Sequence, residues 1–123
     1  MIDHTSLGVR NYRQAVTFYS ACLAPLGYGL QRDTGEEAAF GSKEVWGFFL
    51  YPASSAAPIV GERNHVAFRA PHRAAVEAFY EAALSLGAVS KRPPGGRAEI
   101  APNYFGAVLI DPDGHTLEAV HWS

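Results

Sequence analysis

Cysteine is nearly missing from this chain, which has one, Cys22, in 123 residues. A lone cysteine cannot form an intrachain disulfide, so the fold cannot depend on covalent cross-links. Long hydrophobic runs are missing too, because the densest one, Val45 to Tyr51, is closed by Pro52 and is far too short to span a bilayer. The polar start Met1 to His4 lacks the basic and apolar parts of a signal peptide. We therefore expect a cytoplasmic protein with no membrane partner.

An excess of charge of one sign is also missing. The chain has 10 Lys and Arg against 12 Asp and Glu, a net charge of −2, and no block of like charge. Proteins that bind nucleic acid or anionic membranes usually carry a basic patch, so we expect no nucleic-acid partner. What the chain does have is 48% hydrophobic residues, enough for a domain of this length to bury a core. Small molecules or proteins are the expected partners.

An internal repeat divides the sequence into two halves. Residues of the first half match residues of the second at a constant offset of 61 positions, and the pairs are His4 with His65, Leu7 with Phe68, Phe18-Tyr19 with Phe79-Tyr80, and Leu23 with Leu84. We predict one domain over residues 1–123, made of two modules at about 1–52 and 63–123. The Pro-, Ala-, Ser- and Gly-rich stretch Pro52 to Glu62 is the predicted linker.

Each half has the pattern of a strand, a helix and three further strands. Alternating apolar residues predict opening strands at Ile2–Val9 and Asn64–Ala70, and apolar spacings of three and four predict a helix after each. Further strands are predicted at Tyr28–Asp33, Ala38–Ser42 and Val45–Tyr51, and in the second half at Ala88–Lys91, Tyr104–Ile110 and Thr116–Val120. The predicted class is α+β, with tandem βαβββ modules forming a cupped, partly closed mixed sheet and helices on its outer face.

Three residues form the candidate metal site. His4 and His65 occupy equivalent repeat positions, and Glu118 lies on the face of its strand opposite Leu117 and Ala119. Imidazole and carboxylate suit a divalent Zn, Fe, Mn or Ni ion, and three protein ligands leave positions open for substrate. A single strand histidine is more often structural, but two in matching positions favour a ligand role. Sequence spacing alone does not bring Glu118 near the histidines.

The sequence resembles the vicinal oxygen chelate superfamily of glyoxalases, fosfomycin-resistance proteins, bleomycin-resistance proteins and extradiol dioxygenases. The resemblance covers the whole chain. It rests on the segments His4-Thr5-Ser6-Leu7-Gly8-Val9, Phe18-Tyr19, His65-Val66-Ala67-Phe68 and Asp111-Pro112-Asp113-Gly114-His115-Thr116-Leu117-Glu118. It implies the tandem fold and a divalent metal bound by His4, His65 and Glu118. It also implies a homodimer, because family members commonly pair and some build each site across the subunit interface.

One position departs from the glyoxalase I pattern of that family. Those proteins take a further carboxylate from the last strand of the first module, where this chain has Phe49 and no Glu, Asp or Gln within Trp46–Tyr51. Phe49, Tyr51 and Tyr104 are candidate pocket walls, with core or rim positions as the alternative. Arg97, next to a Gly-Gly pair, is a candidate contact for an anionic substrate or else solvated surface. His115, after the turn glycine, is expected to be solvated.

We therefore expect a metal-dependent enzyme, a lyase, transferase or dioxygenase, in which two neighbouring oxygens of a small substrate chelate the metal. The sequence assigns no catalytic acid or base. The alternative is a binding protein of the bleomycin-resistance type, which would hold a small molecule in the aromatic cup without chemistry. Metal content of the purified protein separates the two hypotheses.

Overall fold

The computed structural model describes residues 1–123 and contains two modules with the same order of elements. The first comprises β1 (Thr5–Val9), α1 (Tyr12–Leu23), the short 3-10 helix η1 (Ala24–Leu26), β2 (Gly29–Asp33), β3 (Ala38–Gly41) and β4 (Trp46–Pro52). The second comprises β5 (His65–Arg69), α2 (Arg73–Ser85), β6 (Val89–Gly96), β7 (Tyr104–Ile110) and β8 (Thr116–Trp122). The predicted α+β class and the tandem βαβββ order are confirmed.

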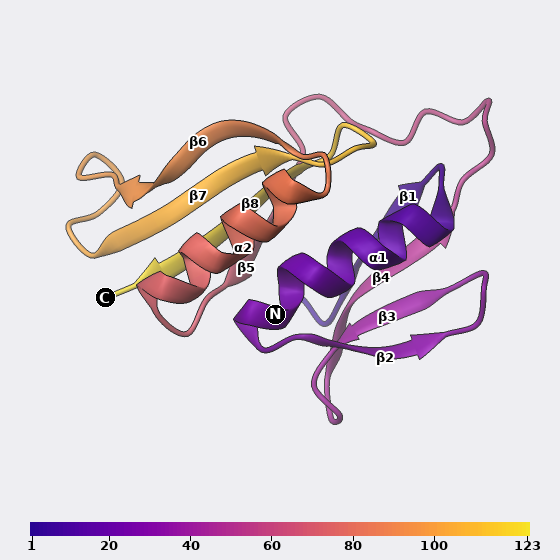
Figure 1. Cartoon of the computed structure of the whole chain (residues 1–123), viewed down its shortest axis with the longest axis horizontal. Helices are drawn as coiled ribbons and strands as arrows, with labels where there is room; N and C mark the ends of the chain where they lie inside the picture. Colours follow the sequence, from indigo (N-terminus) through magenta and orange to yellow (C-terminus); the bar gives the residue numbers. More distant parts are fainter.

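Each module forms its own four-stranded mixed sheet. The strand orders are β1-β4-β3-β2 and β5-β8-β7-β6, so β1 and β5 are edge strands in equivalent places. β1 runs parallel to β4 and β5 runs parallel to β8, whereas the other pairs, which include the second edge strands β2 and β6, are antiparallel. Figure 1 shows both helices on one side of the strands, as predicted. The two sheets are not hydrogen-bonded to each other, so the cup is not closed by a continuous sheet within the chain.

Side-chain packing, rather than a strand ladder, joins the modules. A single core of 24 buried residues runs through both of them, and α1 and α2 lie side by side over it (Figure 1). The rings of Phe48 on β4 and Phe68 on β5 meet edge to face, with centroids 5.1 Å apart. This apolar contact joins β4 of the first sheet to β5 of the second without pairing their backbones.

Local sequence signals fix the ends of both helices. The Asn11 side chain accepts a hydrogen bond from the Gln14 N–H at 3.1 Å, and His72 Nδ1 accepts one from the Ala75 N–H at 3.1 Å. Each cap satisfies a donor that the first helical turn leaves free. Gly87, just beyond α2, has φ +99°, a conformation that favours glycine. Neither helix has the length and apolar character needed to cross a membrane.

Strand β6 continues beyond its predicted end at Lys91, through Pro93 and Pro94 to Gly96. Its pairing with β7 shifts register between Ser90 and Arg92 and again between Arg92 and Gly95. Proline has no N–H to donate, so the strand passes the two prolines only by irregular pairing. The prolines therefore distort the ladder but do not end the strand.

The turn between β7 and β8 is tied to the first module. Asp111, which is buried, accepts hydrogen bonds from the Tyr19 hydroxyl on α1 and from the backbone N–H of His115. Burial of Tyr19, together with the Asp111 charge, raises the pKa of the tyrosine well above its usual value. His115 Nε2 lies 2.8 Å from the carbonyl oxygen of Gly8 on β1.

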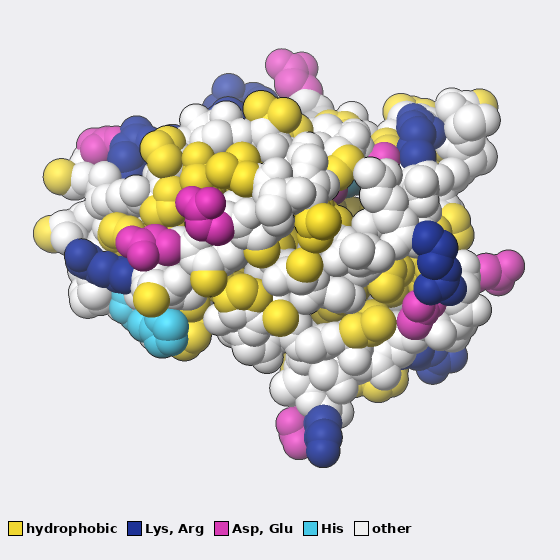
Figure 2. Space-filling model, viewed as in Figure 1, with side chains coloured by type: hydrophobic (Ala, Val, Ile, Leu, Met, Phe, Trp, Pro, Cys, Tyr) yellow, Lys and Arg dark blue, Asp and Glu magenta, His cyan; other side chains and the backbone are white.

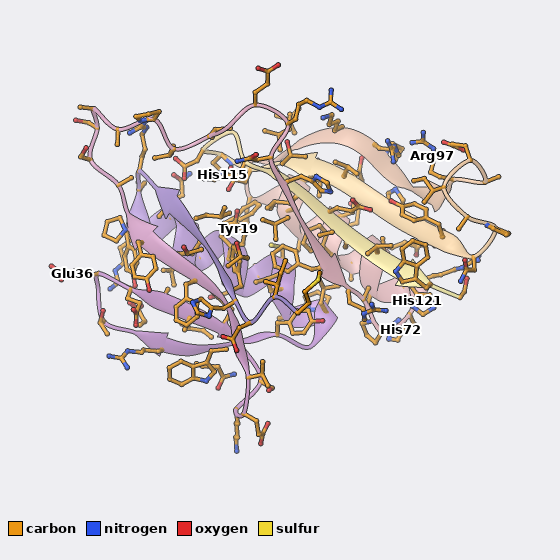
Figure 3. The ribbon with its side chains drawn as sticks, turned by 180° about the vertical axis from the view of Figure 1, so that it is seen from behind. Tyr19, Glu36, His72, Arg97, His115 and His121 are labelled. Atoms are coloured by element: carbon orange, nitrogen blue, oxygen red, sulfur yellow. The ribbon has the colours of Figure 1, made fainter.

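The expectation that His115 is solvated is wrong, because only 6% of the residue is exposed. Its ring lies between the two modules (Figure 3). A buried imidazole needs a hydrogen-bond partner, and the first module provides one in Gly8. The sequence around the turn holds no sign of this contact, because the partner is 107 positions away.

Candidate metal centre

His65 and Glu118 come together on the open face of the second sheet, the face away from α2. In the parallel pair of β5 and β8, His65 is opposite Thr116 and Ala67 is opposite Glu118. The side chains of His65 and Glu118 therefore project on the same side of neighbouring strands. His65 Nε2 is 3.6 Å from Glu118 Oε1, with 53% of the histidine side chain and 15% of the glutamate side chain exposed.

Tyr104 orients the Glu118 carboxylate. Its hydroxyl donates a hydrogen bond to Glu118 Oε2 at 2.6 Å. Burial, followed by the hydrogen bond and charge of Glu118, raises the pKa of Tyr104 to about 12. The phenol therefore stays a donor at any physiological pH. One carboxylate oxygen is thus committed to Tyr104, and Oε1 is left facing His65.

His4 lies on the other module, just before β1. Its ring meets the Phe49 ring edge on, with centroids 5.3 Å apart, and its Nδ1 is 2.6 Å from Asp3 Oδ1. A proton shared between Nδ1 and Asp3 leaves the lone pair of Nε2 free for a ligand role. This matches His65, whose Nε2 is the nitrogen nearest to Glu118.

The strand register gives Phe49 a defined place. Ser6 is opposite Phe49 in the pairing of β1 with β4, and Ala67 is opposite Glu118 in the pairing of β5 with β8. Ser6 and Ala67 differ by the repeat offset of 61 positions. Phe49 is therefore the counterpart of Glu118 in the first module, and a phenyl ring stands where the second module has a carboxylate.

The structure brings together two of the three predicted ligands. Within the chain, no group of three or more His, Cys, Asp or Glu side chains converges on one point. The donor chemistry of His65 and Glu118 fits a borderline divalent metal such as Zn, Mn, Fe or Ni. Only one nitrogen and one carboxylate converge there, and His4 lies on the other module, just before β1.

The predicted pocket residues are divided between the two open faces. Tyr51 stacks on Phe49, with centroids 6.3 Å apart, and donates a hydrogen bond to Glu37 Oε2 at 2.9 Å. That hydrogen bond is the main cause of the raised pKa of Tyr51. Tyr104 is buried beside Glu118. Tyr51 and Phe49 thus line one face and Tyr104 supports the other.

Arg97 lies apart from both faces. It pairs with Glu99 in the connection between β6 and β7, which Figure 3 shows at the far end of the second sheet. A hydrogen bond from its own backbone, followed by the hydrogen bond from Arg97, holds the pKa of Glu99 below its usual value. A substrate role for Arg97 stays a prediction, and in this chain the guanidinium already has a partner.

A cavity of about 430 Å³ opens over the His65 and Glu118 pair. Three cationic side chains line it with them, namely Arg63, Lys91 and Arg92. The sequence alone did not indicate that these three side chains lie beside His65 and Glu118, because charged residues in a linker or at a strand edge usually face solvent. No strand pattern could have signalled Arg63, because it lies in a turn with φ +65° before β5 begins at His65.

Comparisons with known proteins agree with this architecture. The family model described as Glyoxalase/Bleomycin resistance protein/Dioxygenase superfamily matches residues 1–119. A solved glyoxalase/bleomycin resistance protein from Albidiferax ferrireducens T118 is 27% identical, with 97% of each chain covered and a TM-score of 0.85. No curated protein matches the sequence.

Two more distant structures share the fold. A putative glyoxalase from Bacillus halodurans is 17% identical, with 98% of this chain and 95% of that chain covered and a TM-score of 0.74. The fosfomycin resistance protein FosX from Listeria monocytogenes is 19% identical, with 100% and 93% covered and a TM-score of 0.70. At these identities the likeness concerns the fold alone.

Proposed function

Because the chain belongs to the glyoxalase/bleomycin resistance protein/dioxygenase superfamily, we propose that it is a metal-dependent enzyme acting on a small molecule with two neighbouring oxygen atoms. The observation that carries this proposal is the paired His65 and Glu118, with Nε2 and Oε1 3.6 Å apart on an open sheet face. When bound there, a divalent cation would polarise substrate oxygens and stabilise negative charge that develops on them.

The chain's own residues then have distinct roles. His65 and Glu118 hold the cation, and Tyr104 keeps the Glu118 carboxylate in place through its 2.6 Å hydrogen bond. Such outer contacts matter because they fix the direction in which a ligand oxygen points. The open cavity of about 430 Å³ leaves room for substrate next to the two ligands.

We further propose that His4 completes the site from a second copy of the chain. Three observations support this. His4 and the His65 and Glu118 pair lie on separate modules, no third ligand reaches that pair within the chain, and β1 and β5 each present an unpaired edge. An unpaired strand edge is a ready surface for a further strand. A homodimer could place the His4 face of each copy over the His65 face of the other.

A metal titration with subunit mixing tests both parts of the proposal. Metal-free protein should take up one Zn²⁺ or Mn²⁺ per chain, and His4→Ala and His65→Ala should each bind it weakly. If the site is shared, a refolded mixture of these two variants regains tight binding, because one of the two sites in each mixed dimer has both histidines and the other has neither. If the site lay within one chain, mixing would restore nothing. Failure of the unmodified protein to bind metal would contradict the whole proposal.

A metal-free binding protein is the second candidate function. The observation that favours it is the aromatic group on the first module, where Phe49 replaces a carboxylate and stacks on Tyr51 at an interplanar angle of 7°. Such a surface suits a flat apolar ligand. This function predicts protein that is purified without metal and binds hydrophobic ligands equally well in the presence of a chelator.

A further inference from the structure

A second cavity, of about 460 Å³, lies between the edge of β1 and the start of β5. The linker between the modules, residues 53–64, lines it with Ile59 and Val60 among others. His115, the buried histidine whose ring contacts Gly8, also lines this cavity. Figure 3 shows the linker passing from one sheet to the other beside His115. The linker therefore lies against the joint at which the two modules meet.

Arg10, the residue after β1, fastens this linker. Its guanidinium donates hydrogen bonds to the backbone carbonyls of Ser54 at 2.8 Å and Ala57 at 2.7 Å. Its backbone N–H donates to Asp113 Oδ1 at 3.3 Å, in the β7–β8 turn. In Figure 2, basic side-chain atoms lie against the linker at the upper right of the view. Hydrogen bonds from a charged donor are stronger than neutral ones, so one residue firmly connects β1, the linker and the second module.

Two consecutive linker side chains rest on glycines of the two modules. A Cβ added to Gly8 would lie 3.3 Å from Ile59 Cγ2, and one added to Gly114 would lie 3.6 Å from Val60 Cγ2. Gly8 is inside β1 and does not have a positive φ, so no turn requires glycine there. Glycine within a strand often marks the close approach of another segment. Ile59 makes that approach, and the linker thereby spans the joint.

The middle of the linker has few other contacts. Residues 58–60 make no backbone hydrogen bond, and Val60 is 43% exposed. This stretch is followed by Arg63, whose φ of +65° is the one positive value outside glycine. Segments with few backbone hydrogen bonds and little buried surface open at lower cost than the core does. The linker is thus held at its ends and only weakly in its middle.

From these observations we infer that the linker is a releasable strap over the joint between the modules, latched by Arg10 and closed by the contact of Ile59 with Gly8. Opening of the strap exposes His115 and the adjoining cavity to solvent and small molecules, while both sheets stay folded. The closed strap shields the hydrogen bond between His115 and Gly8, which connects the modules. This inference goes beyond the proposed function and does not depend on metal binding by His65 and Glu118.

Chemical labelling of histidine measures the opening of the strap. Diethyl pyrocarbonate modifies neutral imidazoles that solvent reaches, and mass spectrometry of peptides follows each histidine separately. The internal reference is His72, which is exposed and lies far from His115 (Figure 3). In the unmodified protein, His115 should react much more slowly than His72. Arg10→Gln should raise the rate at His115 by about tenfold, the factor expected for lost hydrogen bonds from a charged donor, and leave the rate at His72 unchanged.

Arg13→Gln is the matched control. The Arg13 guanidinium bonds to Asp33 at 2.8 Å rather than to the linker, so this variant should change the rate at His115 by less than about twofold. An unchanged His115 rate in Arg10→Gln would mean that Arg10 does not latch the strap. Equal increases at His115 and His72 would mean that Arg10 supports the whole fold. Either result would overturn the inference.

A double-mutant cycle tests the second contact. Gly8→Ala places a methyl group 3.3 Å from both Ile59 and Ala53, and the displaced strap should raise the His115 rate by about fivefold. In an Ile59→Ala background the same change should raise the rate by only about twofold, because Ala53 alone is then in its way. Equal effects of Gly8→Ala in the two backgrounds would contradict closure of the strap by Ile59.

Discussion

Phe49 and Glu118 occupy the same register position in two copies of one structural unit, yet they give the two sheet faces different chemistry. The first face presents one imidazole, His4, against aromatic rings. The second presents His65 beside a carboxylate that Tyr104 holds in place. The order and pairing of the strands repeat in the two modules, whereas the side chains on the two open faces differ.

This comparison indicates that the two modules offer different chemical groups on their open faces. Under the proposed metal function, the second face would supply an imidazole and a negative oxygen to the cation. The first face would supply one nitrogen and an apolar wall. Changes to the two faces should therefore have unequal effects on metal binding, and the following predictions use that inequality.

The largest effect is expected from Glu118→Ala. The loss of the only anionic ligand should weaken Zn²⁺ binding by more than about a hundredfold, beyond the range typical of losing an outer contact. Titration of metal-free protein with a competing chelator measures this change. The fold should survive, since Glu118 lies on the open face and outside the buried core. A circular dichroism spectrum like that of the unmodified protein is the control, and retained affinity would remove Glu118 from the site.

A smaller effect of opposite sign is expected from Phe49→Glu. This change gives the first face the carboxylate that the second already has, and should strengthen metal binding by about tenfold through one added charged ligand. Phe49→Leu is the matched control, because it removes the ring without adding charge. If both variants bind metal alike, Phe49 does not face the metal.

The same position predicts a missing activity. With phenylalanine in place of the carboxylate, the site has no evident base to move a proton on a hemithioacetal. We expect little or no formation of lactoylglutathione from methylglyoxal and glutathione by the metal-loaded protein, measured by absorbance. Efficient turnover would mean that another residue acts as the base.

Tyr104→Phe should weaken metal binding by about tenfold, at the low end of the range for outer contacts to a ligand. Its pH behaviour provides a second readout. The native pKa of about 12 exceeds the ordinary value of 10.0, so the fold favours the protonated phenol. That stabilisation is complete below pH 10 and is lost as the pH rises toward about 12. Unfolding of the two proteins measured across this range should converge at the alkaline end.

Tyr51→Phe is the matched change on the first face and should have the smallest effect. The Tyr51 hydroxyl bonds to Glu37, which is no candidate ligand. Metal affinity should change by less than about twofold, as expected for an exposed hydrogen bond outside the site. A loss as large as that of Tyr104→Phe would show that the two faces are supported in the same way.

Much of the fold could be predicted from the sequence, because its signals are local. The offset of 61 positions revealed the repeat, and the strand pattern predicted β7 at its observed bounds and the start of β8 at Thr116. Strand alternation also placed Glu118 on the face of its strand opposite Leu117 and Ala119. Its proximity to His65 followed once β5 and β8 became neighbours.

The rest depends on contacts that strand patterns do not encode. Whether β1 and β5 of one chain pair is decided by how the modules pack, and therefore His4 could not be placed relative to His65. The cations Arg63, Lys91 and Arg92 have the appearance of ordinary surface residues until the fold gathers them around one cavity. His115 was misjudged for the same reason, since its partner Gly8 is distant in sequence.

The hydrogen bonds of Tyr19 with Asp111 and of His115 with Gly8 also bear on the thermodynamics of assembly. They tie the β7–β8 turn to α1 and β1, so the angle between the two sheets is set inside each protomer. A flexible hinge would lose conformational entropy on association, and this loss would subtract from affinity. In the proposed homodimer, a chain with this joint would meet its partner preorganised, with the spacing between His4 and the His65 and Glu118 pair already fixed.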